Sequence, residues 1–149
     1  MRLLPLALRR VLSGPALLVL LGAPPASCGE PVVIVNRASG VEKLTRVQVT
    51  NIFLGRQKWL PSGIVAFRIE QNHTSPIRAR FYQLLMGKDE SEINAYWARL
   101  LFSGQAHPPQ RADSAEEVLK LVASNKGAIG VVDGAFVNQG VRVVLEFRD

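Results

Sequence analysis

The segment Gln71–Arg78 holds the side chains whose spacing is best suited to chemistry. Thr74 and Ser75 are hydroxyl donors directly before a proline, which suits the first position of a helix. The free backbone N–H groups and the positive dipole end of a helix N-terminus attract anions. Arg78 and Arg80 would add positive charge to the first turns. The pattern indicates an oxyanion site; the alternative is that Ser75 only caps a helix and the two arginines form a solvated face.

The residue pattern does not favour other reactive centres. His73, His107 and the single cysteine, Cys28, lack the spacing of a zinc site. No Gly-rich nucleotide-binding loop and no Gly-x-Ser-x-Gly motif occurs. The acidic pairs near Asp89 and Glu116 stand where helices are expected to begin, and carboxylates stabilise that dipole end. We therefore expect no enzyme activity, no metal and no cofactor.

The elements that would position the polar segment are recognisable from the sequence. Residues 31–36 form an apolar, β-branched run that predicts a buried strand of a parallel or mixed sheet. Residues 45–55 predict a helix with a Thr-x-x-Gln capping box at its start and a glycine stop at its end. Residues 64–69 predict the second strand. That strand would deliver the polar segment to a helix that is capped by Ser75 and ends at Gly87.

The rest of the chain predicts two more helices and two more strands. The helix between Asp89 and Gly104 would bury an apolar stripe of Ile93, Tyr96, Trp97, Leu100 and Leu101. A helix capped by Ser114 would bury Val118, Leu121 and Val122. Residues 128–132 and 141–147 predict strands, and the second alternates Val141, Val143, Leu145 and Phe147 on one face, as in an edge or half-exposed strand. This order predicts an α/β domain, a mixed sheet flanked by helices.

The first 28 residues are typical of a secretory signal peptide. A basic stretch, an apolar run and a small-residue zone follow one another there. The apolar run is about half of the roughly 20 residues that a membrane-spanning helix needs, and no later stretch approaches that length. We therefore expect a domain in residues 29–149 that is exported to the periplasm and has no transmembrane span. Cys28 could be acylated as in a bacterial lipoprotein, although Pro25 departs from that motif; ordinary cleavage near Cys28 is the alternative.

The net charge of +6 is only weak evidence for a nucleic-acid partner. Three of the basic residues, Arg2, Arg9 and Arg10, belong to the expected signal peptide, which has no acidic residue to balance them. We therefore expect no nucleic-acid binding.

Residues 44–55 read LTRVQVTNIFLG and residues 127–132 read GAIGVV. These phrases resemble the Leu-Ser-x-x-Gln-(Val/Leu)-x-x-Ile-Phe-Leu-Gly and Pro-Gly-Ala-Ile-Gly-Tyr-Val segments of periplasmic phosphate-binding proteins, the substrate-binding proteins of ABC transporters. Trp59 followed by Pro-Ser-Gly at 61–63 is similar to the Trp-x-Asp-Gly turn of that family. Phrases at 78–82 and 96–104 match short exported members of the superfamily. The resemblance implies a short single-domain relative, with a single-lobe type II periplasmic-binding-protein-like fold.

The resemblance also implies an oxyanion site from which several ligands are missing. The corresponding family segment reads Arg-x-x-Gly-Ser-Gly-Thr-Arg, and its first Arg with the Ser, Gly and Thr contacts the anion. In this chain Gln71 stands at the position of that first Arg, and Thr74 at the position of the first Gly. Ser75 corresponds to the Ser, Pro76 to the second Gly and Ile77 to the Thr. Only the serine is retained, and the proline removes a backbone donor. The family is also about twice as long, with two lobes that close on the ligand, so a homodimer of this chain could rebuild a cleft.

Two functions follow from these observations. The first is an exported protein like the substrate-binding proteins of phosphate ABC transporters, with weak oxyanion or phosphate binding through Gln71, Thr74, Ser75 and Arg78. The alternative is a non-transporting periplasmic interaction or sensory module that has lost ligand binding and contacts an envelope protein. The partner surface would then be the exposed edge of strand 141–147 or the face that carries Arg78 and Arg80.

Overall fold

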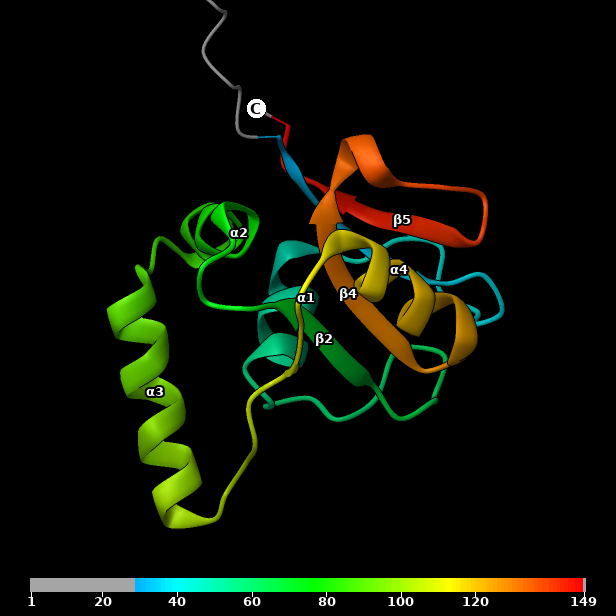
Figure 1. The fold of residues 1–149 in the computed structure, drawn as a ribbon. Helices are drawn as coiled ribbons and strands as arrows, with labels where there is room; N and C mark the ends of the chain where they lie inside the picture. The colour runs from blue at the N-terminus through cyan, green and yellow to red at the C-terminus, as the bar shows by residue number, and fades with distance from the viewer. Residues whose placement is uncertain (1–28, 149) are drawn as a thin grey trace, which may run out of the picture.

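The computed structural model describes residues 29–148, and they form one mixed five-stranded sheet with helices on both faces (Figure 1). The expected signal peptide, including Cys28, lies outside the described residues. The elements in chain order are β1 (Pro31–Asn36), α1 (Arg46–Phe53), β2 (Phe67–Gln71), α2 (Pro76–Met86), α3 (Glu90–Ser103), β3 (Gln110–Ala112), α4 (Ala115–Ser124), β4 (Ala128–Asp133), the 3-10 turn η1 (Gly134–Phe136) and β5 (Val141–Glu146). The α/β architecture expected from the sequence is confirmed.

The strands lie in the order β3-β2-β4-β1-β5. β1 is antiparallel to both of its neighbours, β4 and β5. β2 is parallel to β4, with Ile69 opposite Gly130, and parallel to the short edge strand β3. The polar segment that follows β2 therefore leaves the sheet beside β3 and leads directly into α2.

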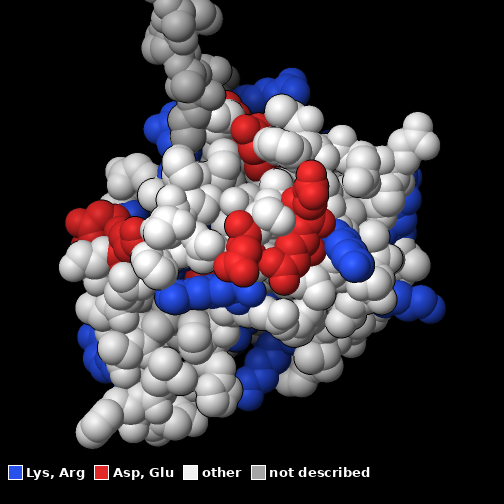
Figure 2. Space-filling view, viewed as in Figure 1, with Lys and Arg blue, Asp and Glu red and all other residues white. Residues whose placement is uncertain are grey.

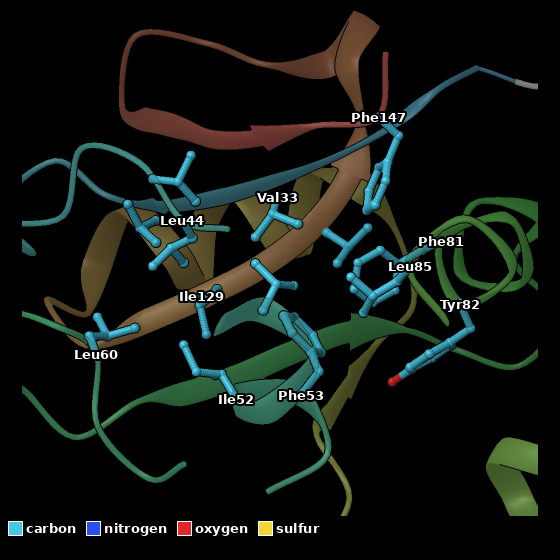
Figure 3. Close-up of a cluster of buried hydrophobic side chains, with 14 of the residues drawn as sticks. Val33, Leu44, Ile52, Phe53, Leu60, Phe81, Tyr82, Leu85, Ile129 and Phe147 are labelled. Carbon is cyan, nitrogen blue, oxygen red and sulfur yellow. The ribbon is translucent and has the colours of Figure 1, made fainter. Parts of the chain in front are cut away.

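The hydrophobic core has two parts, one on each face of the sheet. On one face, Val33 and Val35 of β1 and Ile129 and Val131 of β4 pack against α1, α2 and α3. Figure 3 shows this cluster, in which the rings of Phe53 and Phe81 are 5.0 Å apart. On the other face, alternate residues of the same strands pack against α4 through Val32, Ile34, Val132, Val118 and Val122. The burial of both faces explains the continuous apolar runs of β1 and β4.

The four α-helices begin at the caps expected from the sequence. Thr45 and Asp89 form complete capping boxes for α1 and α3, and the side chains of Ser75 and Ser114 cap α2 and α4. α2 and α3 each end on a glycine with positive φ, a conformation that glycine adopts without a steric penalty. These start and stop signals are local, and all of them are realised.

Four details differ from the sequence expectations. The second strand comprises Phe67–Gln71 rather than 64–69, because residues 59–65 form a turn closed by an isolated Trp59–Val65 bridge. β3 was not expected. Leu101 was expected in the buried stripe of α3, but it is 46% exposed. On α4, the buried residues are Val118, Leu119 and Val122, so Leu119 is buried in place of the expected Leu121.

The alternation expected in the last strand is also interrupted. β5 is an edge strand as expected, but its pairing with β1 shifts register between Val33 and Ile34. Ile34 lies opposite Val143 and Val33 opposite Leu145, so Val144 is the additional residue of a bulge. Val144 is consequently buried in the α1–α2 core, whereas Val143 is half-buried on the α4 side.

The charged side chains on the face shown in Figure 2 are interspersed rather than gathered into one basic stripe. No helix within residues 29–148 is long and apolar enough to cross a membrane. The same residues contain no group of three or more His, Cys, Asp or Glu side chains that could hold a metal ion.

Candidate functional site

The junction between β2 and α2 is built by local hydrogen bonds. The Asn72 side-chain oxygen accepts from the Thr74 backbone N–H at 3.1 Å and from the Thr74 hydroxyl at 2.6 Å. The Ser75 N–H donates to the Asn72 carbonyl at 3.0 Å. This turn reverses the chain and places the Ser75 side chain at the start of α2. The Thr74 hydroxyl proton, expected from the sequence to be available to an anion, is committed to Asn72.

Ser75 fulfils the capping role that its position predicts. Its Oγ accepts from the Arg78 N–H at 3.4 Å and donates to Gln71 Oε1 at 2.9 Å. The structure thus brings Gln71, Ser75 and the first turn of α2 together, with Thr74 beside them. Because the Ser75 hydroxyl bonds to Gln71, an incoming anion would have to displace that bond to use the same proton.

The side chain of Arg78 has a different environment from the one expected. It is 2% exposed, so the expectation of a solvated arginine face is wrong for Arg78. Its Nε donates to Glu70 Oε1 at 3.1 Å and its Nη1 to Glu90 Oε1 at 2.7 Å. The guanidinium also lies 5.3 Å from the centre of the Tyr82 ring. Arg80, in contrast, is half-exposed and lies 3.6 Å from Glu30.

Glu70 organises this buried cluster, although no sequence pattern indicated it. It is 1% exposed; Oε1 accepts from Arg78, and Oε2 accepts from the hydroxyl of Tyr82. Burial is the main cause that raises the pKa of Tyr82 well above 10.0, and the charge of Glu70 and the hydrogen bond to it raise it further. The available sequence signal was a glutamate directly after the apolar run 64–69, at a position where a buried acid requires a paired base.

The charge balance of the cluster disfavours an additional anion. Two carboxylates, Glu70 and Glu90, contact the single guanidinium of Arg78. A buried ion pair of this kind is compensated internally, and little of its positive potential remains for a ligand. The donors that remain for an oxyanion at this junction are few. Among the described residues, Nη2 of Arg78 is buried without a hydrogen-bond partner. In the first turn of α2, Pro76 has no N–H and the Arg78 N–H donates to Ser75 Oγ, so Ile77 supplies the remaining backbone donor.

Solved structures from several organisms share the fold of this chain. One is described as a phosphate ABC transporter substrate-binding protein with bound phosphate from Clostridium perfringens, with a TM-score of 0.63 and 20% identity over 78% of this chain and 44% of that chain. An ABC-type phosphate transport receptor from Vibrio cholerae has a TM-score of 0.62 and 19% identity over 78% and 45% of the two chains. PstS from Borrelia burgdorferi has a TM-score of 0.60 and 12% identity over 78% and 46%.

This chain therefore spans less than half the length of each of these proteins. The match confirms the expected fold, a single lobe of the periplasmic-binding-protein-like type, with a mixed sheet flanked by helices. No protein-family model matches the sequence, and no curated protein matches it.

Proposed function

We propose that this chain is an exported module that keeps the fold of one lobe of a phosphate-binding protein but does not capture phosphate for transport. In this proposal it acts in the periplasm as an interaction or sensory module. The observation that carries the proposal is the neutralisation of Arg78 by Glu70 and Glu90, at 3.1 and 2.7 Å. The positive charge nearest the expected oxyanion site is thereby committed to two carboxylates of the same chain.

The hydroxyl groups support the same proposal. Thr74 donates to Asn72 and Ser75 donates to Gln71, so both hydroxyls are satisfied without a ligand. Each charge-assisted hydrogen bond is worth roughly 1.5–3 kcal/mol. A site without its guanidinium and with both hydroxyls committed would therefore lose several decades of affinity relative to a fully liganded one.

A second candidate function is weak oxyanion binding at the same junction through Gln71, Thr74, Ser75 and Arg78. One observation favours it: Ser75 stands at the N-cap of an eleven-residue helix, whose dipole attracts an anion and whose first turn offers the backbone N–H of Ile77. The phosphate bound in the structural relative from Clostridium perfringens makes phosphate the first ligand to try. Binding would be weak, because Pro76 supplies no N–H and Arg78 supplies no uncompensated charge.

A thermal-unfolding series with phosphate and sulfate separates the two candidates. A ligand that binds only the folded protein at ten times its Kd stabilises it by about 1.4 kcal/mol. We expect no stabilisation beyond the ionic-strength effect of sodium chloride at 10 mM phosphate. A saturable rise of the melting temperature specific to phosphate would contradict the non-transporting module and support the second candidate.

The envelope partner is a further part of this proposal. β5 is an edge strand of the sheet, and an edge strand can pair with a strand from another protein or from a second copy of the chain. The Val144 carbonyl of β5 already accepts from the Leu44 N–H at 2.9 Å, so such a strand would have to pair with the other backbone groups of this edge. Affinity capture from an envelope extract and sedimentation of the purified protein test these two cases. A protein that sediments as a monomer and captures no specific partner would contradict the interaction module.

A further inference from the structure

Arg68 differs from Arg78 because no carboxylate neutralises it. It lies near the start of β2, two residues before Glu70 and away from the junction with α2. Nη1 donates to the carbonyl of Phe53 at 3.0 Å, and Nη2 donates to the carbonyl of His107 at 2.7 Å. The guanidinium stacks on the Trp97 ring at 5.3 Å. Among residues 29–148, no Asp or Glu oxygen lies within 4.0 Å of it.

This arrangement fixes the guanidinium without cancelling its charge. Two carbonyls and an aromatic face orient the group, and N–H donors are left over, since a guanidinium has five. Burial is the main cause that lowers the pKa of Arg68, while the nearby charge of Glu70 acts in the opposite direction. Glu70 itself is held by Arg78 and Tyr82, so it does not neutralise Arg68 directly. An anion beside Arg68 would offset the cost of its partial burial.

A pocket of about 230 Å³ opens beside Arg68. It lies between the turn after α1, the start of β2 and the connection from α3 to β3. Lys58 and His107 line it together with Arg68, and no Asp or Glu does. Val65, Ala66 and Ala106 give it an apolar wall. The pocket is smaller than those that hold drug-sized ligands, and its lining combines cationic donors with aliphatic contacts.

We propose that this pocket binds a small organic carboxylate, with the carboxylate against Arg68 and Lys58 and a short aliphatic body against Val65 and Ala106. The fork of a guanidinium matches the two oxygens of a carboxylate. The apolar wall favours a ligand with a hydrocarbon body over a fully hydrated inorganic anion, because burial of that body gains free energy. The site is separate from the β2–α2 junction and goes beyond the function proposed above.

Amide chemical-shift titration of the full-length purified protein with sodium butyrate tests this proposal. We expect saturable shifts of the Gly55 and Ala106 amides, both of which line the pocket. Lys58 is exposed, so Lys58→Glu can be made without disturbing the core. It should weaken butyrate binding at least about tenfold, because it replaces a charge-assisted contact with a like charge. Lys126→Glu, the same charge change at an exposed residue outside the pocket lining, should leave the binding unchanged.

Two further arms identify the ligand chemistry and the place of binding. Ala106→Leu narrows the pocket at its apolar wall and should abolish the butyrate shifts, while the remaining spectrum reports whether the fold is intact. Inorganic phosphate should shift the pocket amides less than butyrate does at the same concentration. Four outcomes would overturn the proposal. They are equal shifts with both anions, an equal loss of affinity in Lys58→Glu and Lys126→Glu, non-saturable shifts, and butyrate shifts confined to residues 74–78. The last outcome would instead locate the anion at the junction, so failures of the two proposals are distinguishable.

Discussion

Arg78 Nε lies 3.1 Å from Glu70 Oε1, and each side chain is only 1% exposed. This contact joins the first turns of α2 to β2 inside the fold. The same guanidinium also contacts Glu90 of α3, so one arginine connects three elements. The ion pair with Glu70 explains how the charged side chain of Arg78 can occupy a buried position that an apolar side chain would otherwise fill.

Arg78→Met should destabilise the protein strongly. The substitution leaves the carboxylate of Glu70 buried with Tyr82 as its remaining hydrogen-bond partner. Removing one partner of a buried ion pair typically costs about 3–5 kcal/mol. Urea denaturation measures the change, and Arg80→Met serves as the control, because Arg80 is half-exposed and its loss should cost no more than about 0.5 kcal/mol. Equal stabilities of the two variants would show that the buried pair is not formed in solution.

Tyr82 should make the protein less stable above pH 10. Its pKa in the folded state is raised above 10.0, so the folded state retains the phenolic proton that the unfolded state loses. The stabilisation is complete below pH 10 and is lost as the pH rises toward the folded-state pKa, by up to about 1.4 kcal/mol per pH unit. Tyr82→Phe lacks this proton, so the stability advantage of the wild type over the variant should narrow above pH 10. Denaturation at a series of pH values measures it, and a constant difference up to pH 11.5 would contradict the buried hydroxyl.

Gly130→Ala should be destabilising because α4 packs closely over β4 at that residue. A Cβ atom at Gly130 would lie 2.8 Å from Cγ1 of Val118 and 3.1 Å from Cγ2 of Val122. Overpacking of a core typically costs about 1–3 kcal/mol. Val118→Ala removes the nearer methyl group, so the double variant should be more stable than the two single effects predict when added. Strict additivity in this double-mutant cycle would contradict the close approach of α4.

The features that could be predicted from the sequence are those set by nearby residues. The caps at Thr45, Ser75, Asp89 and Ser114 each depend on a side chain and a backbone group three residues away. The sequence predicts a start of β2 at residue 64, three residues before the observed start, because residues 64–66 are apolar enough for a strand. The actual boundary is set by pairing with β4 and β3, which are distant in the chain.

The environment of the candidate site depended on contacts that no local pattern contains. Arg78 is buried because Glu70 of β2 and Glu90 of α3 converge on it from different elements. The pocket beside Arg68 likewise requires the Trp59–Val65 turn and the α3–β3 connection to meet. The sequence therefore predicted which residues lie at the β2–α2 junction, but not that the charge of Arg78 is already compensated there.

The bulge in β5 predicts different sensitivities for two adjacent valines. Val144 is 4% exposed in the α1–α2 core, and Val143 is half-buried. Val144→Thr places a hydroxyl in the core and should cost about 1–3 kcal/mol, whereas Val143→Thr should cost less because its hydroxyl can reach water. Denaturant unfolding compares the pair directly. The opposite order would support the uninterrupted alternation that the sequence suggested.

Glu90→Gln should strengthen phosphate binding at the β2–α2 junction if compensation of Arg78 is what suppresses it. The carboxylate of Glu90 lies 2.7 Å from Nη1 of Arg78 and is one-third exposed, so the substitution removes one negative charge with little change of shape. In a partly solvated site, removing one unit charge a few ångströms from the anion changes the binding free energy by on the order of 1 kcal/mol, which is about fivefold in Kd. Thermal unfolding with up to 50 mM phosphate, against sodium chloride of equal ionic strength, measures the gain.

Glu116→Gln is the matched control for that experiment. It makes the same charge change at an exposed residue in the first turn of α4, away from Arg78. Phosphate should stabilise Glu90→Gln more than Glu116→Gln, because only the first variant leaves the guanidinium of Arg78 with a single carboxylate partner. Identical responses of the two variants would mean that net charge alone governs any phosphate effect. The neutralised arginine would then not account for the weak phosphate binding proposed for this lobe, and the proposed function would lose its main support.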